Sequence, residues 1–352
     1  MNILRALALL FSAVSVAAAQ SVPHETLLAL SKRDHTLAVV DPATLKVIGR
    51  ASSGDDPHEV VASADGTTAY ISNYGGGGLH TLTPVDITTQ KTLPEIELGP
   101  LRGPHGLHFV GGKVWFTAEG AKIIGSYDPA SSKVDWVLGT GENRTHMIFV
   151  AEDLKRIITT NVSSGTVSII EKTAGGPPPG QPPGATGPPP GAPPRGPMGP
   201  PGGDWNQTLV TVGPGSEGFD VSPDGKELWA ANSQDGKVNV VDIASKKVVA
   251  SIPAEMQGAN RLKFTPDGKL AFVSSLRGAE VAVLDAASRK VVKRVKVGRG
   301  AAGIQMQPDG SRVFVACTPD GYVAVIDLKS LEVTGHIDVG PEPDGLAWAV
   351  GR

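Results

Sequence analysis

The chain has 352 residues, a formal net charge of −3 at pH 7 and 40% hydrophobic residues. Its one cysteine, Cys317, excludes an intramolecular disulfide, and we expect a buried, inert thiol there. Lysines and arginines are scattered rather than clustered, so we expect no nucleic-acid partner.

Residues 1–19 have the pattern of a secretory signal peptide. One cation, Arg5, precedes an apolar stretch that ends in Ala17-Ala18-Ala19, which signal peptidase accepts. The stretch is shorter than the ~20 apolar residues of a membrane span, and no stop-transfer pattern follows it. We therefore predict a periplasmic or extracellular protein that does not span the membrane after cleavage.

Short β-type runs then follow in a repeating order. The first three runs are predicted at Thr26–Ser31, Thr36–Asp41 and Leu45–Arg50. Whole repeats of four runs begin near Pro57, Pro104, Thr145, Ser216, Ala259 and Ala301. The last run, Pro343–Val350, supplies only the first strand of a repeat.

The repeat is clearest over residues 216–254. Turns with the sequences SPDG, SQDG and IASK separate the predicted strands Gly218–Ser222, Glu227–Asn232, Lys237–Asp242 and Lys247–Ile252. Such punctuation predicts an antiparallel four-stranded meander. An acidic residue ends the third strand of each repeat and gives the period: Asp41, Asp86, Asp128, Glu171, Asp242, Asp285 and Asp327. The steps are 42 to 45 residues, apart from one of 71.

The long step contains a Pro/Gly-rich insertion, residues 175–203, between the third strand ending at Glu171 and the fourth strand at Trp205–Val212. Without its 29 residues the step is again 42. Its glycines are irregularly spaced, which excludes a collagen helix and favours polyproline II segments that are disordered on average. A contact with the cell envelope or another partner and a tolerated loop expansion both remain open.

A lone four-stranded meander leaves one face unburied, so repeats of this length predict a β-propeller. Six whole repeats and one divided repeat predict seven blades. The C-terminal first strand joins three N-terminal strands in the divided blade, which removes the exposed edges of an open array. We therefore predict one all-β, seven-bladed propeller over residues 25–350.

Two repeats carry a family resemblance. The stretches AAGIQMQPDGSRVFVACTPDGYVAVIDLKSLEVTGHIDVG and SEGFDVSPDGKELWAANSQDGKVNVVDIASKKVVA resemble the YVTN-type repeat of the YncE-like seven-bladed propellers. The likeness spans residues 25–349 apart from the insertion. It implies a propeller that serves mainly as a binding scaffold.

Aligning the repeats brings polar residues to one mouth of the central channel. The second residue of each first strand is His58, His105, His146, Glu217, Asn260, Ala302 or Asp344. The second strand runs antiparallel, so its last residue should lie alongside; these residues include Asn73, Glu119, Asn161 and Asn232. Together with Arg261, they predict a polar ligand-binding funnel for a small molecule or a protein.

A divalent metal is one predicted ligand of this funnel. His58, His105 and His146 come from consecutive blades and, with Glu119, form the predicted ligand set. Imidazole with carboxylate suits zinc, whereas magnesium requires that carboxylate and water dominate. The alternative is that the histidines are simply solvated or bonded to loop carbonyls.

A second, local resemblance concerns the stretch GPHGLHFVGGKVWFTAEGAKIIGSYDP. It looks like one blade of the virginiamycin B lyase group, in which a histidine opening the first strand and a glutamate after WFT belong to a magnesium-dependent active site. The matching residues are His105 and Glu119, and His146 would be a further catalytic residue. The resemblance thus implies a metal-dependent lyase, or by extension a lactone hydrolase.

Three function classes follow. The first choice is an exported, non-catalytic binding scaffold, because no complete catalytic triad or nucleophile motif is present. The second is the metal-dependent lyase or lactone hydrolase at the same rim. The third is a periplasmic protein associated with electron transfer, although the chain has no CxxCH motif for covalent haem.

Overall fold

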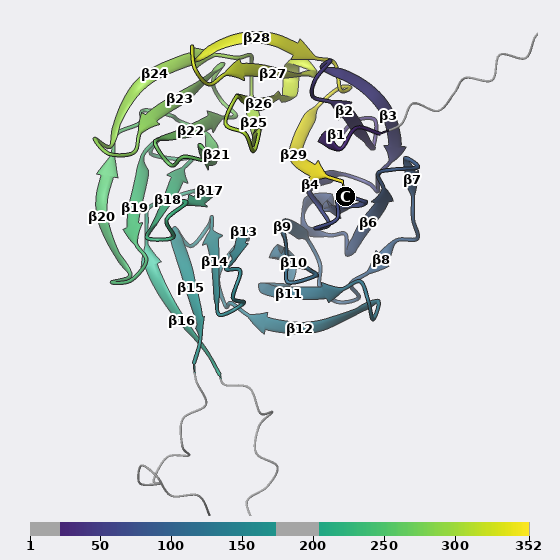
Figure 1. Ribbon diagram of the computed structural model, residues 1–352. Coiled ribbons are helices and arrows are strands. Elements are labelled where there is room, and N and C mark those ends of the chain that lie inside the picture. Colours follow the sequence, from purple (N-terminus) through teal and green to yellow (C-terminus); the bar gives the residue numbers. More distant parts are fainter. Residues whose placement is uncertain (1–21, 174–203, 352) are drawn as a thin grey trace, which may run out of the picture.

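The computed structural model describes residues 22–173 and 204–351, which form seven antiparallel sheets arranged in a ring (Figure 1). The prediction of a seven-bladed all-β propeller is confirmed. The predicted signal peptide and the predicted insertion lie outside the described residues. Within the described ranges, no helix is long and apolar enough to cross a membrane.

Each blade contributes one strand to each of four concentric rings. The innermost strands are β4 (Pro57–Ala62), β9 (Pro104–Val110), β13 (Thr145–Val150), β17 (Ser216–Val221), β21 (Ala259–Phe264), β25 (Ala301–Met306) and β29 (Pro343–Val350). The second strands are β5 (Thr68–Asn73), β10 (Lys113–Ala118), β14 (Arg156–Asn161), β18 (Glu227–Asn232), β22 (Leu270–Ser275), β26 (Arg312–Cys317) and β1 (Glu25–Ser31).

The outer two rings complete the blades. The third strands are β6 (Thr81–Asp86), β11 (Ile123–Asp128), β15 (Thr166–Lys172), β19 (Val238–Asp242), β23 (Glu280–Asp285), β27 (Tyr322–Asp327) and β2 (Thr36–Asp41). The outermost are β7 (Lys91–Thr92) with β8 (Ile96–Glu97), β12 (Lys133–Gly139), β16 (Trp205–Thr211), β20 (Lys247–Ile252), β24 (Lys290–Lys296), β28 (Glu332–Ile337) and β3 (Lys46–Ser52). Three 3-10 turns follow second strands: η1 (Gly75–Gly77), η2 (Glu119–Ala121) and η3 (Thr318–Asp320).

The core lies between neighbouring blades. The second and third strands are covered on both faces, so their apolar residues run continuously instead of alternating with polar ones. In β27 the four residues between Tyr322 and Asp327 are all buried. Trp229 of one blade is fully buried against Phe264 of the next, with ring centroids 5.2 Å apart.

Both ends of the described chain meet in one blade. The strand order there is β29-β1-β2-β3, and β29 pairs with β1 in antiparallel register, with Thr26 opposite Ala349. In Figure 1 the yellow C-terminal strand lies beside the purple N-terminal strands. Ring closure therefore rests on pairing between the two termini, as predicted.

Hydroxyl groups of the second strands fix the start of several inner strands to the preceding blade. Thr117 Oγ1 in β10 donates to the carbonyl of His146 in β13 at 2.7 Å, and it accepts from Gly106 N–H at 2.9 Å. Ser72 and Thr160 hold the carbonyls of His105 and Glu217 in the same way. These bonds set the backbone positions of three residues at the channel mouth.

Candidate functional site

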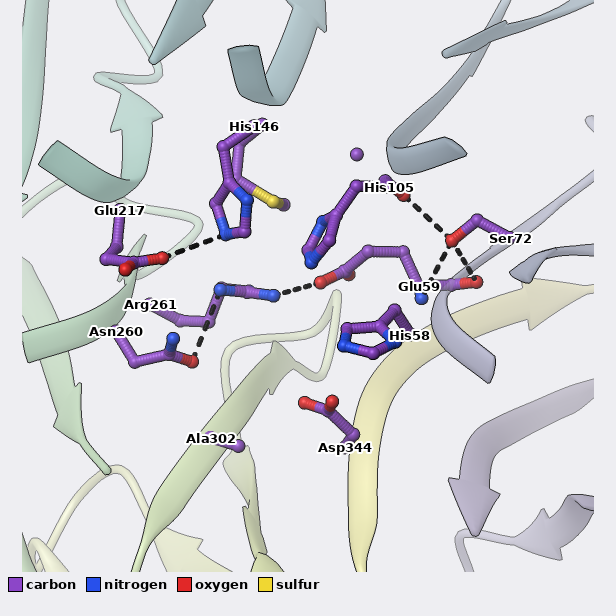
Figure 2. Close-up of polar contacts among 12 residues, drawn as sticks. His58, Glu59, Ser72, His105, His146, Glu217, Asn260, Arg261, Ala302 and Asp344 are labelled. Carbon is purple, nitrogen blue, oxygen red and sulfur yellow. Dashed lines mark hydrogen bonds and ion pairs between the residues drawn. The ribbon is translucent and has the colours of Figure 1, made fainter. Parts of the chain in front are cut away.

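The inner strands begin at one mouth of the channel, and their second residues converge there (Figure 2). The mouth contains a cavity of about 240 Å³. Its lining combines residues expected from the sequence with others from neighbouring loops: Lys32, His58, Tyr74, His105, Arg144, His146, Glu217, Asn260, Arg261, Leu276, Thr318 and Asp344.

His146 lies between two carboxylates. Its Nδ1 is 2.5 Å from Glu119 Oε1, and its Nε2 is 3.0 Å from Glu217 Oε2. The second contact is an ion pair that is poorly aligned for a hydrogen bond, which leaves the buried Nε2 without a hydrogen-bond partner. The imidazole itself is 3% exposed.

The two carboxylates set the charge of this ring. Burial opposes protonation, but the contacts with Glu119 and Glu217 outweigh it and raise the pKa of His146. Burial likewise opposes ionisation of Glu217, yet His146 and the nearby arginines lower its pKa to about 2. The two carboxylates therefore favour the protonated form of His146.

His105 lies beside this cluster and is neutral. Its ring centroid is 3.9 Å from that of His146. Burial first, and then the positive charges of His146 and Arg261, lower the pKa of His105 well below its usual value. Its buried Nδ1 has no hydrogen-bond partner. A neutral imidazole with an unpartnered nitrogen is suited to accept a ligand.

His58 is already engaged by a loop residue. Lys32 Nζ lies 2.9 Å from its Nε2, and Asp56 O lies 3.1 Å from its Nδ1. Because an ammonium group can only donate, Nε2 accepts and Nδ1 carries the proton. Lys32 also contacts Asp344 at 3.5 Å. His58 therefore offers no free nitrogen to an ion in this arrangement.

Glu119 and Arg261 anchor the walls of the cavity. Tyr74 donates to Glu119 Oε2 at 2.6 Å, and Arg144 Nε is 3.5 Å from the same oxygen. Arg261, which is 7% exposed, pairs across the channel with Glu59 and donates to Asn260 Oδ1 at 3.2 Å. The carboxylates of Glu119 and Glu59 thus both have positively charged neighbours.

Three predicted funnel residues lie elsewhere. Asn73 donates to Thr81 and Thr83, and Asn161 donates to Thr166 and Ser168 of its own blade. Asn232 donates to the carbonyl of Val212. None of these amides is among the residues that line the cavity, so they hold strands together inside the propeller instead of forming its mouth. Glu217, Asn260, Arg261 and Asp344 do line it.

Residues near the site that were not singled out from the sequence include Glu59 and three loop residues, Lys32, Tyr74 and Arg144. Glu59 follows His58 directly, and its opposite charge to Arg261 at the same strand position in another blade is the signal that could have found it. The other three lie in loops, where strand register gives no position.

The predicted metal ligands are only partly together. Among the described residues, His105, Glu119 and His146 offer ligand atoms that all lie within 4.8 Å of one another. His58 is not in this group, although its ring is 4.9 Å from that of His105. The donor set is two imidazoles and one carboxylate, with Glu217 next to His146. Such a set suits a transition metal better than magnesium.

Sequence comparisons match one part of the chain. Residues 221–344 match the family model described as the cytochrome D1 heme domain, which covers less than half of the chain. No curated protein matches the sequence.

Several solved structures share the fold. A functionally unknown protein from Desulfotomaculum acetoxidans DSM 771 has a TM-score of 0.73 at 12% identity, over 93% of this chain and 99% of its own. Kuenenia stuttgartiensis hydrazine synthase has a TM-score of 0.67 at 17% identity, over 86% of this chain and 92% of its own. Dihydro-heme d1 dehydrogenase NirN in complex with DHE has a TM-score of 0.60 at 14% identity, over 91% of this chain and 74% of its own. These likenesses show the propeller fold.

Proposed function

We propose that this propeller is an exported binding scaffold that holds a small ligand or ion at the histidine-lined mouth. The observation that carries the proposal is the buried His105 Nδ1, which has no hydrogen-bond partner, beside the His146 ring and a cavity of about 240 Å³. A buried polar atom without a partner costs ~1–3 kcal/mol, which a bound ligand would recover. No catalytic nucleophile is needed for this role.

The ligand that fits this chemistry best is a divalent transition metal such as zinc. His105, His146 and Glu119 would hold it, with Glu217 as a further carboxylate and His58 joining only if Lys32 moves away. Binding would replace one ring proton of protonated His146 by the ion and release it to solvent, because the coordinating nitrogen must be deprotonated. The two carboxylates that now stabilise the imidazolium would then stabilise the metal.

Metal titration tests this proposal. Protein purified without a His tag and treated with chelator is titrated with zinc by calorimetry, alongside His105→Ala, His146→Ala and the outer-strand control His336→Ala. We expect the first two variants to lose affinity at least ~10-fold, as substitutions at ligands do, and the control to bind like the parent. Equal affinity in all four proteins, or no binding by the parent, would contradict the metal assignment.

A metal-dependent lyase or lactone hydrolase is the second candidate, favoured by the resemblance around His105 and Glu119. A bound metal would polarise a substrate carbonyl or a water. Glu119 is held by His146 and Tyr74, so it would orient His146, and His146 would move the proton. Metal-dependent opening of a cyclic ester, lost in His146→Ala, would distinguish this candidate from a scaffold.

A haem-related periplasmic role is the third candidate, favoured by the cytochrome D1 heme domain match and by the fold shared with a dihydro-heme d1 dehydrogenase. The mouth histidines offer nitrogen ligands for such a group. The cavity of about 240 Å³ is, however, below the ~300–1,000 Å³ of pockets for drug-sized ligands, which favours an ion or a small molecule.

We further propose that the chain is a YVTN-repeat relative of the YncE-like propellers, located in the periplasm or outside the cell. The support is the repeat pattern and the seven-bladed ring. The Pro/Gly-rich residues 175–203 would then be available for contact with the cell envelope.

A further inference from the structure

The third residue of the inner strand differs among the blades. In four blades it is glycine: Gly106, Gly218, Gly303 and Gly345. A Cβ at each of these positions would overlap the backbone carbonyl of the neighbouring blade's second residue. The other three blades carry Glu59, Met147 and Arg261. These three long side chains all line one cavity among the inner strands.

Glu59 and Arg261 close the channel as an ion pair between blades that lie on opposite sides of the ring (Figure 2). Arg261 lines the cavity at the histidine mouth and also a second cavity of about 270 Å³, farther along the inner strands. Arg261 thus lies between the two cavities, whereas Glu59 and Met147 line only the second one. The histidine site does not extend into the second chamber.

The walls of the second chamber are about half apolar and half polar. Five of the side chains that line it are Val61, Leu107, Phe109, Met147 and Leu346. Leu107 and Leu346 are buried, and the other three are half-buried toward the chamber. A chamber of this kind favours an apolar body, with a few polar groups to orient it.

The polar groups at this chamber are mainly donors. Val150 N–H donates to His108 Nδ1 at 2.9 Å, so the neutral ring carries its proton on Nε2 and offers a donor. Burial, with Lys263 second, lowers the pKa of His108 to about 4, which keeps the ring neutral at pH 7. Lys263 has a side chain that is 42% exposed, and its contact with Asp220 is a loose 3.5 Å.

Two of the nearby carboxylates are already engaged. Glu59 is paired with Arg261, and Asp220 Oδ2 accepts from Phe264 N–H at 3.0 Å. A ligand with a carboxylate can therefore take Lys263 from Asp220 and accept from His108. A ligand amine would instead face the positive charges of Lys263 and Arg261.

We propose that this second chamber is a binding site for a small aromatic or branched aliphatic carboxylate, with its apolar body against Phe109, Met147 and Leu346 and its carboxylate at Lys263 and His108. The site is independent of the histidine mouth.

Methyl NMR on protein labelled with ¹³C-methyl methionine tests this proposal. Benzoate, benzyl alcohol and benzylamine are titrated separately into the parent protein. We expect benzoate to shift the Met147 methyl signal in a saturable way and to leave buried Met256, which lies in another cluster, unchanged. Benzylamine should bind more weakly than benzyl alcohol, and benzyl alcohol more weakly than benzoate.

Variants separate this site from the histidine mouth. Lys263→Met should weaken benzoate about two- to fivefold, as expected for a partly exposed charge pair, and leave benzyl alcohol unchanged. Val61→Phe should fill the chamber and weaken the binding of both benzoate and benzyl alcohol. His105→Ala should leave both affinities unchanged. Equal binding of benzoate and benzylamine, an unshifted Met147, or loss of benzoate in His105→Ala would overturn the proposal.

Discussion

His108 is the residue whose titration most clearly affects stability. Its pKa is lowered to about 4 in the folded protein, mainly by burial, whereas an unperturbed histidine titrates near 6.5. The unfolded state therefore binds the proton more tightly. The stabilisation from neutral His108 is complete above about pH 6.5, declines as the pH falls below that value and stops declining below about pH 4. At pH 5 the loss is about 2 kcal/mol.

We expect His108→Gln to remove this pH dependence. Urea unfolding of the parent and the variant is compared at pH 7 and pH 5, and the parent should lose about 2 kcal/mol more than the variant between the two. The exposed His336→Gln serves as control and should follow the parent. A variant that loses as much stability as the parent would show that His108 keeps an ordinary pKa.

The histidine positions in strands could be predicted from the sequence, and the cavity residues in loops could not. His105 and His146 were found because strand pairing places equivalent residues at one mouth. Lys32 and Arg144 reach the same cavity from loops, and Arg144 adopts a left-handed backbone with φ 54° that no repeat indicates. Asn73 was misplaced because it pairs with Pro57, the first strand residue, and its side chain points into the blade.

At the scale of the element, Gly106 explains how closely two inner strands approach. A Cβ there would overlap the carbonyl oxygen of His146, a backbone atom that Thr117 also holds by a hydrogen bond. Neither neighbour can move without breaking the contact between β9 and β13. The glycine is therefore required by the packing of the blades and not by its backbone angles.

Gly106→Ala should destabilise the propeller by about 1–3 kcal/mol, the usual cost of overpacking. Gly139→Ala is the matched control, because a Cβ on this exposed β12 residue meets nothing within 4 Å, and its effect should stay within about 0.5 kcal/mol. Urea unfolding midpoints measure both. Equal free energies of unfolding for the Gly106→Ala and Gly139→Ala variants would show that β9 and β13 can move apart at little energetic cost.

The presence of a strand could be predicted wherever turn signals recur, but the residues at which it begins and ends were harder to predict. The predicted strand Gly218–Ser222 begins two residues earlier, at Ser216, because Ser216 already pairs with Asn232. A bulge between Ser216 and Phe219 hides this pairing from the alternating pattern. The outermost strand of the first whole repeat is split into β7 and β8, which a single continuous run would not predict.

At the scale of the whole molecule, the repeat period predicted the ring, because the number of strands in each repeat shows which blades are complete and which is divided. Six whole repeats and complementary strand fragments at the two ends leave one arrangement in which every inner strand has two neighbours. The division of the channel into two chambers was not predictable. It depends on which side chains meet across the axis, and Glu59 and Arg261 are about 200 residues apart in the sequence.

Ring closure by β29 is the feature on which the whole fold depends. β29 pairs with β1 and buries Leu346, Ala347 and Ala349 between blades. Removing residues 343–352 would expose the edge of β1 and the core of two interfaces at once. We expect this truncated protein to lose its cooperative transition, or to melt far below the parent, in thermal unfolding followed by circular dichroism.

Two further proteins make the result specific to the strand. Removing only residues 351–352 leaves β29 intact and should barely change the melting temperature. Adding a synthetic peptide of residues 343–352 to the longer truncation should raise its melting temperature as peptide concentration increases, because binding to the folded form stabilises it by mass action. If the longer truncation melts cooperatively at the parent temperature, closure by β29 does not hold the ring together.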